Sequence, residues 1–169
     1  SYICHPSMAN NELSGPLVLS AIAKIIKPSF YSVRIILIPE TIGAIAYINK
    51  NLKKLKKNLL AGFNLTCVGD QGNFSIIMSK EENTYADKIA KRNFKDAKLY
   101  TFLSRGSNER QFGCQNLNLP FVTITRSKFN EFKEYHTSLD NLDFIKEKSL
   151  KECTFKVLKM IDDIQKSKI

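Results

Sequence analysis

Short runs of β-branched and aromatic residues alternate in this chain with longer runs whose apolar residues recur at helical spacing. The short runs predict strands at 1–4, 31–38, 59–68, 74–78, 99–103 and 121–125. The longer runs predict helices at 14–26, 41–49, 84–94 and 150–164. The strand at 31–38 is so rich in β-branched residues that we expect it in the centre of a sheet. Strands that alternate with helices favour an α/β fold, a three-layer sandwich around a mixed, mostly parallel central sheet.

The length of 169 residues fits one α/β domain, expected over 1–169, and the 43% hydrophobic content is sufficient for a core. No apolar stretch reaches the roughly 20 residues that a membrane helix needs. The chain opens inside an apolar run without a basic leader, which is unlike a signal peptide and suggests a fragment of a longer chain. We therefore expect a cytoplasmic protein with no membrane partner.

The four cysteines are widely spaced and form no Cys-x-x-Cys pair: Cys4, Cys67, Cys114 and Cys153. In a domain of this size, that pattern predicts free thiols rather than a disulfide framework. Cys4 stands beside His5 and is a weak candidate for a nucleophile, because neighbours in a strand point to opposite faces.

The net charge of +10 comes mostly from lysines, which gather at 50–57 and 146–168. Proteins that bind nucleic acids usually interleave arginine and aromatic residues on one face. These lysines instead fall on the outer faces of expected helices, so they predict a solvated surface and make a nucleic-acid partner a weak expectation.

Both histidines of the chain, His5 and His136, lie in loops beside proline or small polar residues, where packing alone explains them poorly. Glu40 follows the strand at 31–38, and a polar loop covers 105–110. In an open α/β sheet, ligands bind beyond the carboxyl ends of the strands, so these four pieces are expected to converge on one edge. Imidazoles bind zinc and a nearby glutamate acts as general base. The pattern predicts a metal-assisted hydrolase site with the two imidazole rings within about 7 Å of each other.

Each of these residues also has a structural alternative. His5 can cap the turn that follows it, and Glu40 can favour the start of a helix through the helix dipole. Asn108 and Glu109 are common in ordinary turns. Arg105 can hold a substrate carboxylate or pair with Glu109, and so can Arg110, and the residues alone leave this open.

Four segments occur in an order that has a precedent. They are 4–15 (Cys-His-Pro-Ser-Met-Ala-Asn-Asn-Glu-Leu-Ser-Gly), 38–43 (Ile-Pro-Glu-Thr-Ile-Gly), 105–112 (Arg-Gly-Ser-Asn-Glu-Arg-Gln-Phe) and 135–141 (Tyr-His-Thr-Ser-Leu-Asp-Asn). This set resembles the bacterial aminopeptidase-like domain family, relatives of the zinc aminopeptidases with a phosphorylase/hydrolase-like fold, often associated with surface-polysaccharide genes. The resemblance runs from residue 1 to about residue 165. It implies an upstream segment and a C-terminal winged helix in full-length relatives, neither of which this sequence contains.

The resemblance implies a role for each matched residue. His5 and His136 correspond to metal-binding histidines, and Asn11 falls where a metal-binding aspartate is expected. Glu40 corresponds to the general base that activates the attacking water. The candidate substrate-binding residues are Arg105, Asn108, Glu109 and Tyr135, of which Asn108 replaces an aspartate of the family pattern.

Three departures weaken the expected metal site. Asn11 replaces the aspartate, Thr41 stands where two-zinc aminopeptidases carry a second glutamate, and Thr66 with Cys67 stands where they carry an aspartate. An amide offers one neutral oxygen, whereas a carboxylate can bridge two cations and offset their charge. We therefore expect one zinc ion, bound weakly or absent, held by His5, His136 and an oxygen of Asn11 or Glu12.

The function expected from these observations is zinc-dependent, aminopeptidase-like hydrolysis of an amide bond, with a small peptide or an aminoacyl or N-acyl group as substrate. The alternative is a catalytically degenerate binding module in surface-polysaccharide biosynthesis. A nucleic-acid-associated module is a third and weaker hypothesis, and the sequence leaves open whether the protein forms a homo-oligomer.

Overall fold

The computed structural model describes residues 1–167, and across them it contains four strands in one sheet. The strands are β1 (Gly62–Leu65), β2 (Ser75–Ile77), β3 (Lys98–Tyr100) and β4 (Phe121–Thr125), in the order β1-β4-β2-β3. β1 pairs with β4 in parallel, β2 pairs with β3 in parallel, and β2 with β4 is antiparallel. The sheet is thus mixed and mostly parallel, which confirms the expected α/β fold class.

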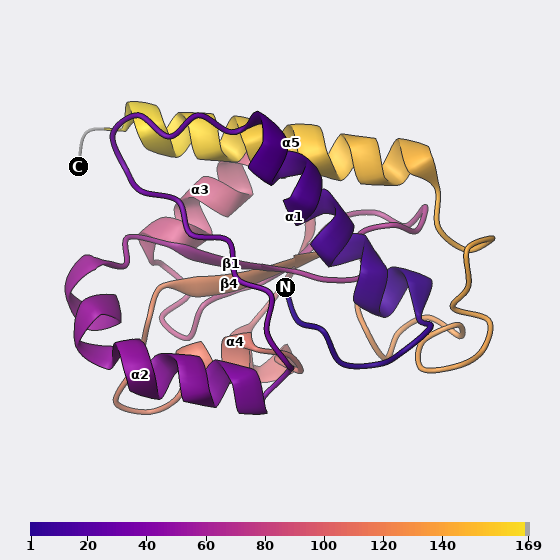
Figure 1. Ribbon diagram of the computed structural model, residues 1–169, viewed down its shortest axis with the longest axis horizontal. Coiled ribbons are helices and arrows are strands. Elements are labelled where there is room, and N and C mark those ends of the chain that lie inside the picture. Colours follow the sequence, from indigo (N-terminus) through magenta and orange to yellow (C-terminus); the bar gives the residue numbers. More distant parts are fainter. Residues whose placement is uncertain (168–169) are drawn as a thin grey trace.

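Helices cover both faces of the sheet (Figure 1). On one face lie α1 (Ser14–Ile25), α3 (Tyr85–Asn93) and α5 (Glu147–Lys166), and on the other lie α2 (Ile42–Asn58) and the short α4 (Glu109–Phe112). A π-helical turn, η1 (Ala9–Leu13), leads into α1, and a 3-10 turn, η2 (Phe102–Ser104), precedes α4. The larger core lies under α1, α3 and α5 around Ile22, Ile76 and Met160, and the smaller one lies under α2 and α4 around Ala44 and Phe112.

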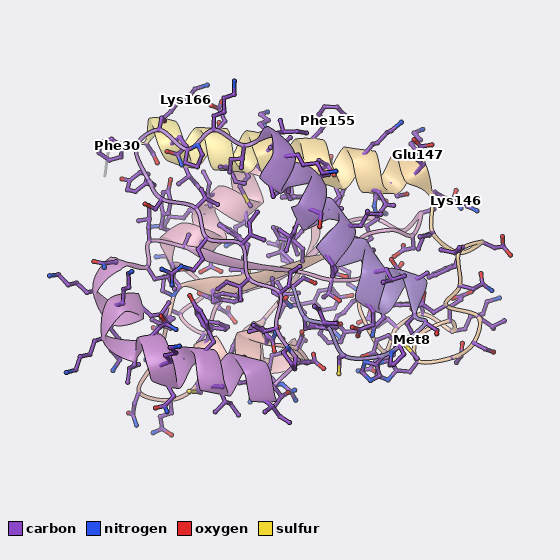
Figure 2. The ribbon with its side chains drawn as sticks, in the orientation of Figure 1. Met8, Phe30, Lys146, Glu147, Phe155 and Lys166 are labelled. Carbon is purple, nitrogen blue, oxygen red and sulfur yellow. The ribbon has the colours of Figure 1, made fainter. Side chains whose placement is uncertain are left out.

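Two expected helices differ from their predicted form. α2 continues to Asn58 rather than ending near residue 49, because its lysines lie on the exposed side while Ala44, Ile48 and Leu55 face the core. α5 begins and ends outside its predicted bounds of 150–164, and Phe155 and Lys166 on its outer side point away from the sheet (Figure 2). No helix among the described residues is long and apolar enough to cross a membrane.

The expected strands at 1–4 and 31–38, the second of them expected in the centre of the sheet, are absent from the observed sheet. Among the described residues, the two segments pair with each other only through a parallel bridge between Tyr2 and Ile38 and through hydrogen bonds to the carbonyls of Ile36 and Ile38. A cavity of about 580 Å³ separates the segment 31–38 from β1, with Ser1, Ile36 and Phe63 among the lining residues. Its β-branched composition is that of a buried strand, yet no strand of the described chain lies beside it to complete a ladder.

Two backbone contacts at the start of the chain bring several loops to one edge of the sheet. Besides the Tyr2–Ile38 bridge, the Ile3 amide donates to the Ile38 carbonyl at 2.9 Å. The Tyr2 hydroxyl reaches Thr66, at the end of β1, at 2.6 Å. The loops that follow Tyr2, Ile38 and β1 therefore begin side by side at one edge.

Candidate metal centre

His5 is held against Glu12, the last polar residue of η1. The His5 Nδ1 atom lies 3.0 Å from the Glu12 Oε1 atom, and the second carboxylate oxygen of Glu12 accepts the Cys4 amide at 2.6 Å. Glu12 is buried, whereas the side chain of His5 is about one-third exposed. The carboxylate thus fixes both the imidazole and the backbone before it, and it leaves one side of the ring open to solvent.

Asn11 presents its amide nitrogen, rather than its oxygen, to this cluster. Its Nδ2 atom donates to Glu12 Oε1 at 2.9 Å and lies 3.5 Å from His5 Nδ1. Its Oδ1 atom accepts from the Tyr2 hydroxyl at 3.0 Å and from the Cys67 thiol at 3.7 Å. Because a carboxylate only accepts hydrogen bonds, Glu12 dictates this orientation. In this arrangement Glu12, and not Asn11, offers an oxygen beside His5, which is the second of the two sources expected from sequence.

His136 reaches the same place from the far end of the chain. The ring centroids of His5 and His136 are 4.3 Å apart, closer than the roughly 7 Å expected for ligands of one ion. Tyr135 stacks on His136 at 3.9 Å, and His136 has a φ of 57°. A histidine in this left-handed region carries backbone strain, which persists only where surrounding contacts enforce it.

Asp140, four residues after His136, anchors the loop that contains this strained residue. Its buried carboxylate accepts the backbone amides of Asn10 at 2.6 Å and Asn11 at 2.9 Å, and its carbonyl accepts the Ala9 amide at 3.0 Å. A carboxylate that accepts two amides at the start of a helical turn is a strong, charge-assisted clamp. The clamp ties the loop of His136 to η1 and thereby to Glu12.

His5 and Glu12 have donor atoms within 4.8 Å of each other, and the ring centroid of His136 lies 4.3 Å from that of His5. Imidazoles and carboxylates are the ligands that zinc takes in hydrolases, so the residues at this place fit one ion of the zinc class. Burial, and then the neighbouring His5, lower the pKa of His136 from its ordinary value of 6.5, which favours the neutral imidazole that binds metals. Thr41 and Thr66 supply no carboxylate at the places where a second ion would need one. The site therefore suits a single ion.

Glu40 lies at the same edge with the electrostatics of a base. It is half-buried, and desolvation raises its pKa above 4.5, although a hydrogen bond from Ser107 and the charge of Arg110 oppose the rise. The negative charges of Glu109 and Glu12 raise it further. A carboxylate with a raised pKa accepts a proton more readily at neutral pH, as general-base catalysis requires.

Asn108, which precedes α4, and Arg110, which lies in α4, hold the turn that contains Glu40. Asn108 is buried, and its Oδ1 atom accepts the Thr41 amide at 3.0 Å. Thr41 has a φ of 59°, so this turn is also strained. Arg110 donates to the Thr41 hydroxyl at 3.0 Å. Asn108 and Arg110 thus hold the backbone that aims Glu40.

Two of the expected substrate-binding residues, Glu109 and Arg105, contact their own loop and its neighbours. Glu109 is fully buried and accepts the amides of Gly106 at 2.7 Å and Ser107 at 2.9 Å and the Thr123 hydroxyl at 2.7 Å, so it orders its own loop. Arg105 is exposed and stacks on Phe102 at 4.8 Å. Tyr135 stays at the site, where burial and the charges of Cys67, Glu40 and Glu12 raise its pKa to about 12.

The sequence pattern did not single out Asp140 or Tyr2, and it left Arg110 as a partner of Glu109 or of a substrate carboxylate. Asp140 stands in the quoted segment 135–141, four residues after His136, but only the structure shows that its carboxylate is buried. Tyr2 is an apolar-run residue whose hydroxyl contacts with Asn11 and Thr66 arise only through tertiary folding.

Comparison with known proteins agrees with this fold. The family model described as "Domain of unknown function (DUF4910)" matches residues 1–167. A Clostridium acetobutylicum protein, named for polysaccharide biosynthesis and an aminopeptidase-like domain, is 36% identical over 174 residues, which cover 99% of this chain and 40% of that protein. The chain thus spans about two-fifths of the length of this relative.

Solved structures give the same result. The crystal structure of a candidate peptidase from Clostridium acetobutylicum matches with a TM-score of 0.90 and 36% identity, over 97% of this chain and 40% of that one. A zinc aminopeptidase from Bacillus subtilis matches with a TM-score of 0.74 and 18% identity, over 99% of this chain and 47% of that one. The second likeness shows the fold alone. The chain belongs to the DUF4910 family, and its fold is that of the aminopeptidase-like domains.

Proposed function

We propose that this domain is a zinc-dependent, aminopeptidase-like hydrolase that cleaves an amide bond. The observation that carries the proposal is the meeting of His5, His136 and Glu12 at one sheet edge, with the ring centroids of the histidines 4.3 Å apart and Glu12 3.0 Å from His5. Four segments far apart in sequence build that edge, and two of them contain residues with a strained, positive φ, Thr41 and His136. The Thr41 amide donates to Asn108, and Asp140 in the loop of His136 accepts the Asn11 amide.

Each residue has a separable task in this proposal. His5, Glu12 and His136 hold the ion, which when bound supplies Lewis-acid polarisation of the scissile carbonyl and of the attacking water. Glu40 takes the proton from that water and returns it to the leaving amine. A hydrogen bond from Ser107 and then the charge of Arg110 oppose the rise in the pKa of Glu40. Tyr135 forms a wall beside His136.

The substrate is proposed as a class only. An amide at a peptide N-terminus, or an aminoacyl or N-acyl group on a sugar, suits the chemistry. The polysaccharide-biosynthesis name of the Clostridium acetobutylicum relative supports the sugar-linked option.

The test is zinc-dependent amide cleavage by the full-length protein, assayed on aminoacyl-naphthylamides and N-acylated amino sugars. Glu40→Gln is expected to bind zinc with unchanged affinity and to lose activity by about 10²–10⁴-fold, the usual contribution of a general base. Glu81→Gln, an exposed glutamate outside the site, is the matched control and should keep full activity. If Glu40→Gln loses zinc instead, Glu40 is a ligand and its assignment as base is wrong.

A second candidate is a catalytically degenerate binding module in surface-polysaccharide biosynthesis. Asn11, Thr41 and Thr66 favour it, since none of them supplies the charge that an active two-ion centre needs. Zinc binding with no cleavage of any amide substrate, in the presence of saturable binding to an acylated sugar, would support this candidate over the hydrolase.

A further inference from the structure

Cys4 lies where a further metal ligand would lie. The Cys4 Sγ atom, a ring nitrogen of His5 and a carboxylate oxygen of Glu12 all lie within 4.8 Å of one another. Ligands held at 2.0–2.3 Å around one tetrahedral zinc ion are roughly 3.4 Å apart. Small side-chain rotations are therefore enough to bring the three donors onto one ion.

A bend in the backbone at His5 allows the side chains of two adjacent residues to face the same carboxylate. Adjacent residues of a regular strand point to opposite faces. Here the chain leaves the extended conformation at the bend that begins at His5, so Cys4 and His5 both face Glu12. The Ile3 amide donates to the Ile38 carbonyl and the Cys4 amide donates to the Glu12 carboxylate, so these two hydrogen bonds fix the backbone at Cys4.

The four cysteines are free, but they differ in what surrounds them. Cys67 and Cys153 are buried, and Cys114 is exposed. Among the described residues, Cys4 is the only cysteine in a group of three or more potential metal-binding side chains. A backbone hydrogen bond from Glu40 also reaches the Cys4 thiol.

We propose that Cys4 supplies a thiolate ligand to the ion, which is then held by Cys4, His5 and Glu12 with His136 beside them. This proposal rests on the metal site of the proposed function and adds Cys4 to the residues that bind the ion. On binding, the thiol proton is released to solvent as the sulfur–metal bond forms, so atoms and charge balance without a redox partner. A sulfur ligand selects soft ions, so zinc and cadmium should bind more tightly than magnesium or manganese.

Cobalt(II) titration of the full-length protein tests the ligand set without using activity. Cobalt bound to a thiolate gives a near-ultraviolet charge-transfer band, whereas imidazole and carboxylate ligands give only the weaker visible bands. The wild-type protein should show both. Cys4→Ser should lose the near-ultraviolet band, keep the visible bands and bind zinc about tenfold or more weakly. Cys114→Ser, at an exposed cysteine outside the site, should keep both bands.

Alkylation of the wild-type protein gives a second readout that needs no variant. Iodoacetamide, with the modified peptide identified by mass spectrometry, should label Cys4 and Cys114, and saturating zinc should slow labelling of Cys4 alone. Visible cobalt bands without the near-ultraviolet band, or equal labelling of Cys4 with and without zinc, would overturn the thiolate while leaving the metal site intact. No binding of cobalt or zinc would overturn both this inference and the metal-dependent function.

Discussion

At the scale of single residues, the side-chain amide of Asn11 is the group through which we expect this site to be tuned for a cation. Its amide nitrogen donates to Glu12 and its oxygen is occupied by Tyr2 and Cys67. The oxygen that zinc would need therefore faces the protein interior, and a neutral donor group faces the site. In the proposed metal site, we therefore expect Asn11 to hold a cation less tightly than an aspartate at the same place would.

The first prediction concerns Asn11→Asp. A carboxylate in this place lies within about 3 Å of Glu12, so the two like charges should lower the thermal stability of the metal-free protein. Zinc relieves that repulsion and gains an oxygen ligand, so its affinity should rise about tenfold or more, measured by isothermal titration calorimetry. Asn141→Asp adds the same charge at an exposed residue of the neighbouring loop and should change neither quantity. Equal zinc affinities for Asn11→Asp and wild type would show that residue 11 does not reach the ion.

The second prediction concerns Glu131, an exposed residue five positions before His136 whose hydrogen-bond partner lies on β3. The Tyr100 hydroxyl donates to it at 2.5 Å, and Lys98 lies 3.5 Å away, so the pKa of Glu131 is lowered below 4.5, chiefly by the Tyr100 hydrogen bond. A lowered folded-state pKa means that this contact contributes stability above pH 4.5, and that the contribution is lost as pH falls through the lowered pKa. Carboxyl NMR titration should give a value below 4.5 that rises in Tyr100→Phe. The same value in both proteins would contradict the assigned cause.

At the scale of elements, the Asp140 clamp is the contact that joins the last loop of the site to its first helical turn. Asp140→Asn keeps one acceptor oxygen but turns an amide nitrogen toward the amide of Asn10 or Asn11. We expect a loss of roughly 1.5–3 kcal/mol in the free energy of unfolding, the range for a hydrogen bond to a charged group, measured by urea denaturation. Zinc affinity should fall as well, because the His136 loop is no longer tied to Glu12.

The control for this third prediction is Asp143→Asn, an exposed aspartate of the same loop. It should keep both the stability and the zinc affinity of the wild type. A stable Asp140→Asn protein with unaltered zinc affinity would mean that the stacking of Tyr135 and His136, rather than the clamp, positions the ring.

At the scale of the whole molecule, helices cover both faces of the sheet (Figure 1). The sheet ends at β1, and the cavity that the segment 31–38 borders lies beside this strand. The backbone amides of residues 32–37 have no protein acceptor among the described residues, whereas β4 pairs with neighbours on both sides. Stability is therefore expected to be uneven across the domain.

Hydrogen exchange checks this fourth prediction. Amides of residues 32–37 should exchange close to the rate of an unfolded chain, and those of Val122 and Ile124 in β4 should be the most protected. Strong protection of residues 32–37 in this 169-residue chain would mean that the segment pairs with a strand in solution, as its composition alone suggested.

The sequence by itself determined the fold class, most of the elements and the quoted residues of the site. Strand and helix periodicities are local properties, and they predicted β4 at its observed bounds and α3 and α5 to within a few residues. The tertiary structure alone decided the isolated position of residues 31–37, the inward-facing oxygen of Asn11, the burial of Glu109 and the approach of Cys4 to Glu12. Each of these depends on contacts between elements, such as those with β1, Tyr2, Thr123 or Glu12, that local periodicity does not predict. Hydrogen-bond direction and burial are fixed only when those partners meet.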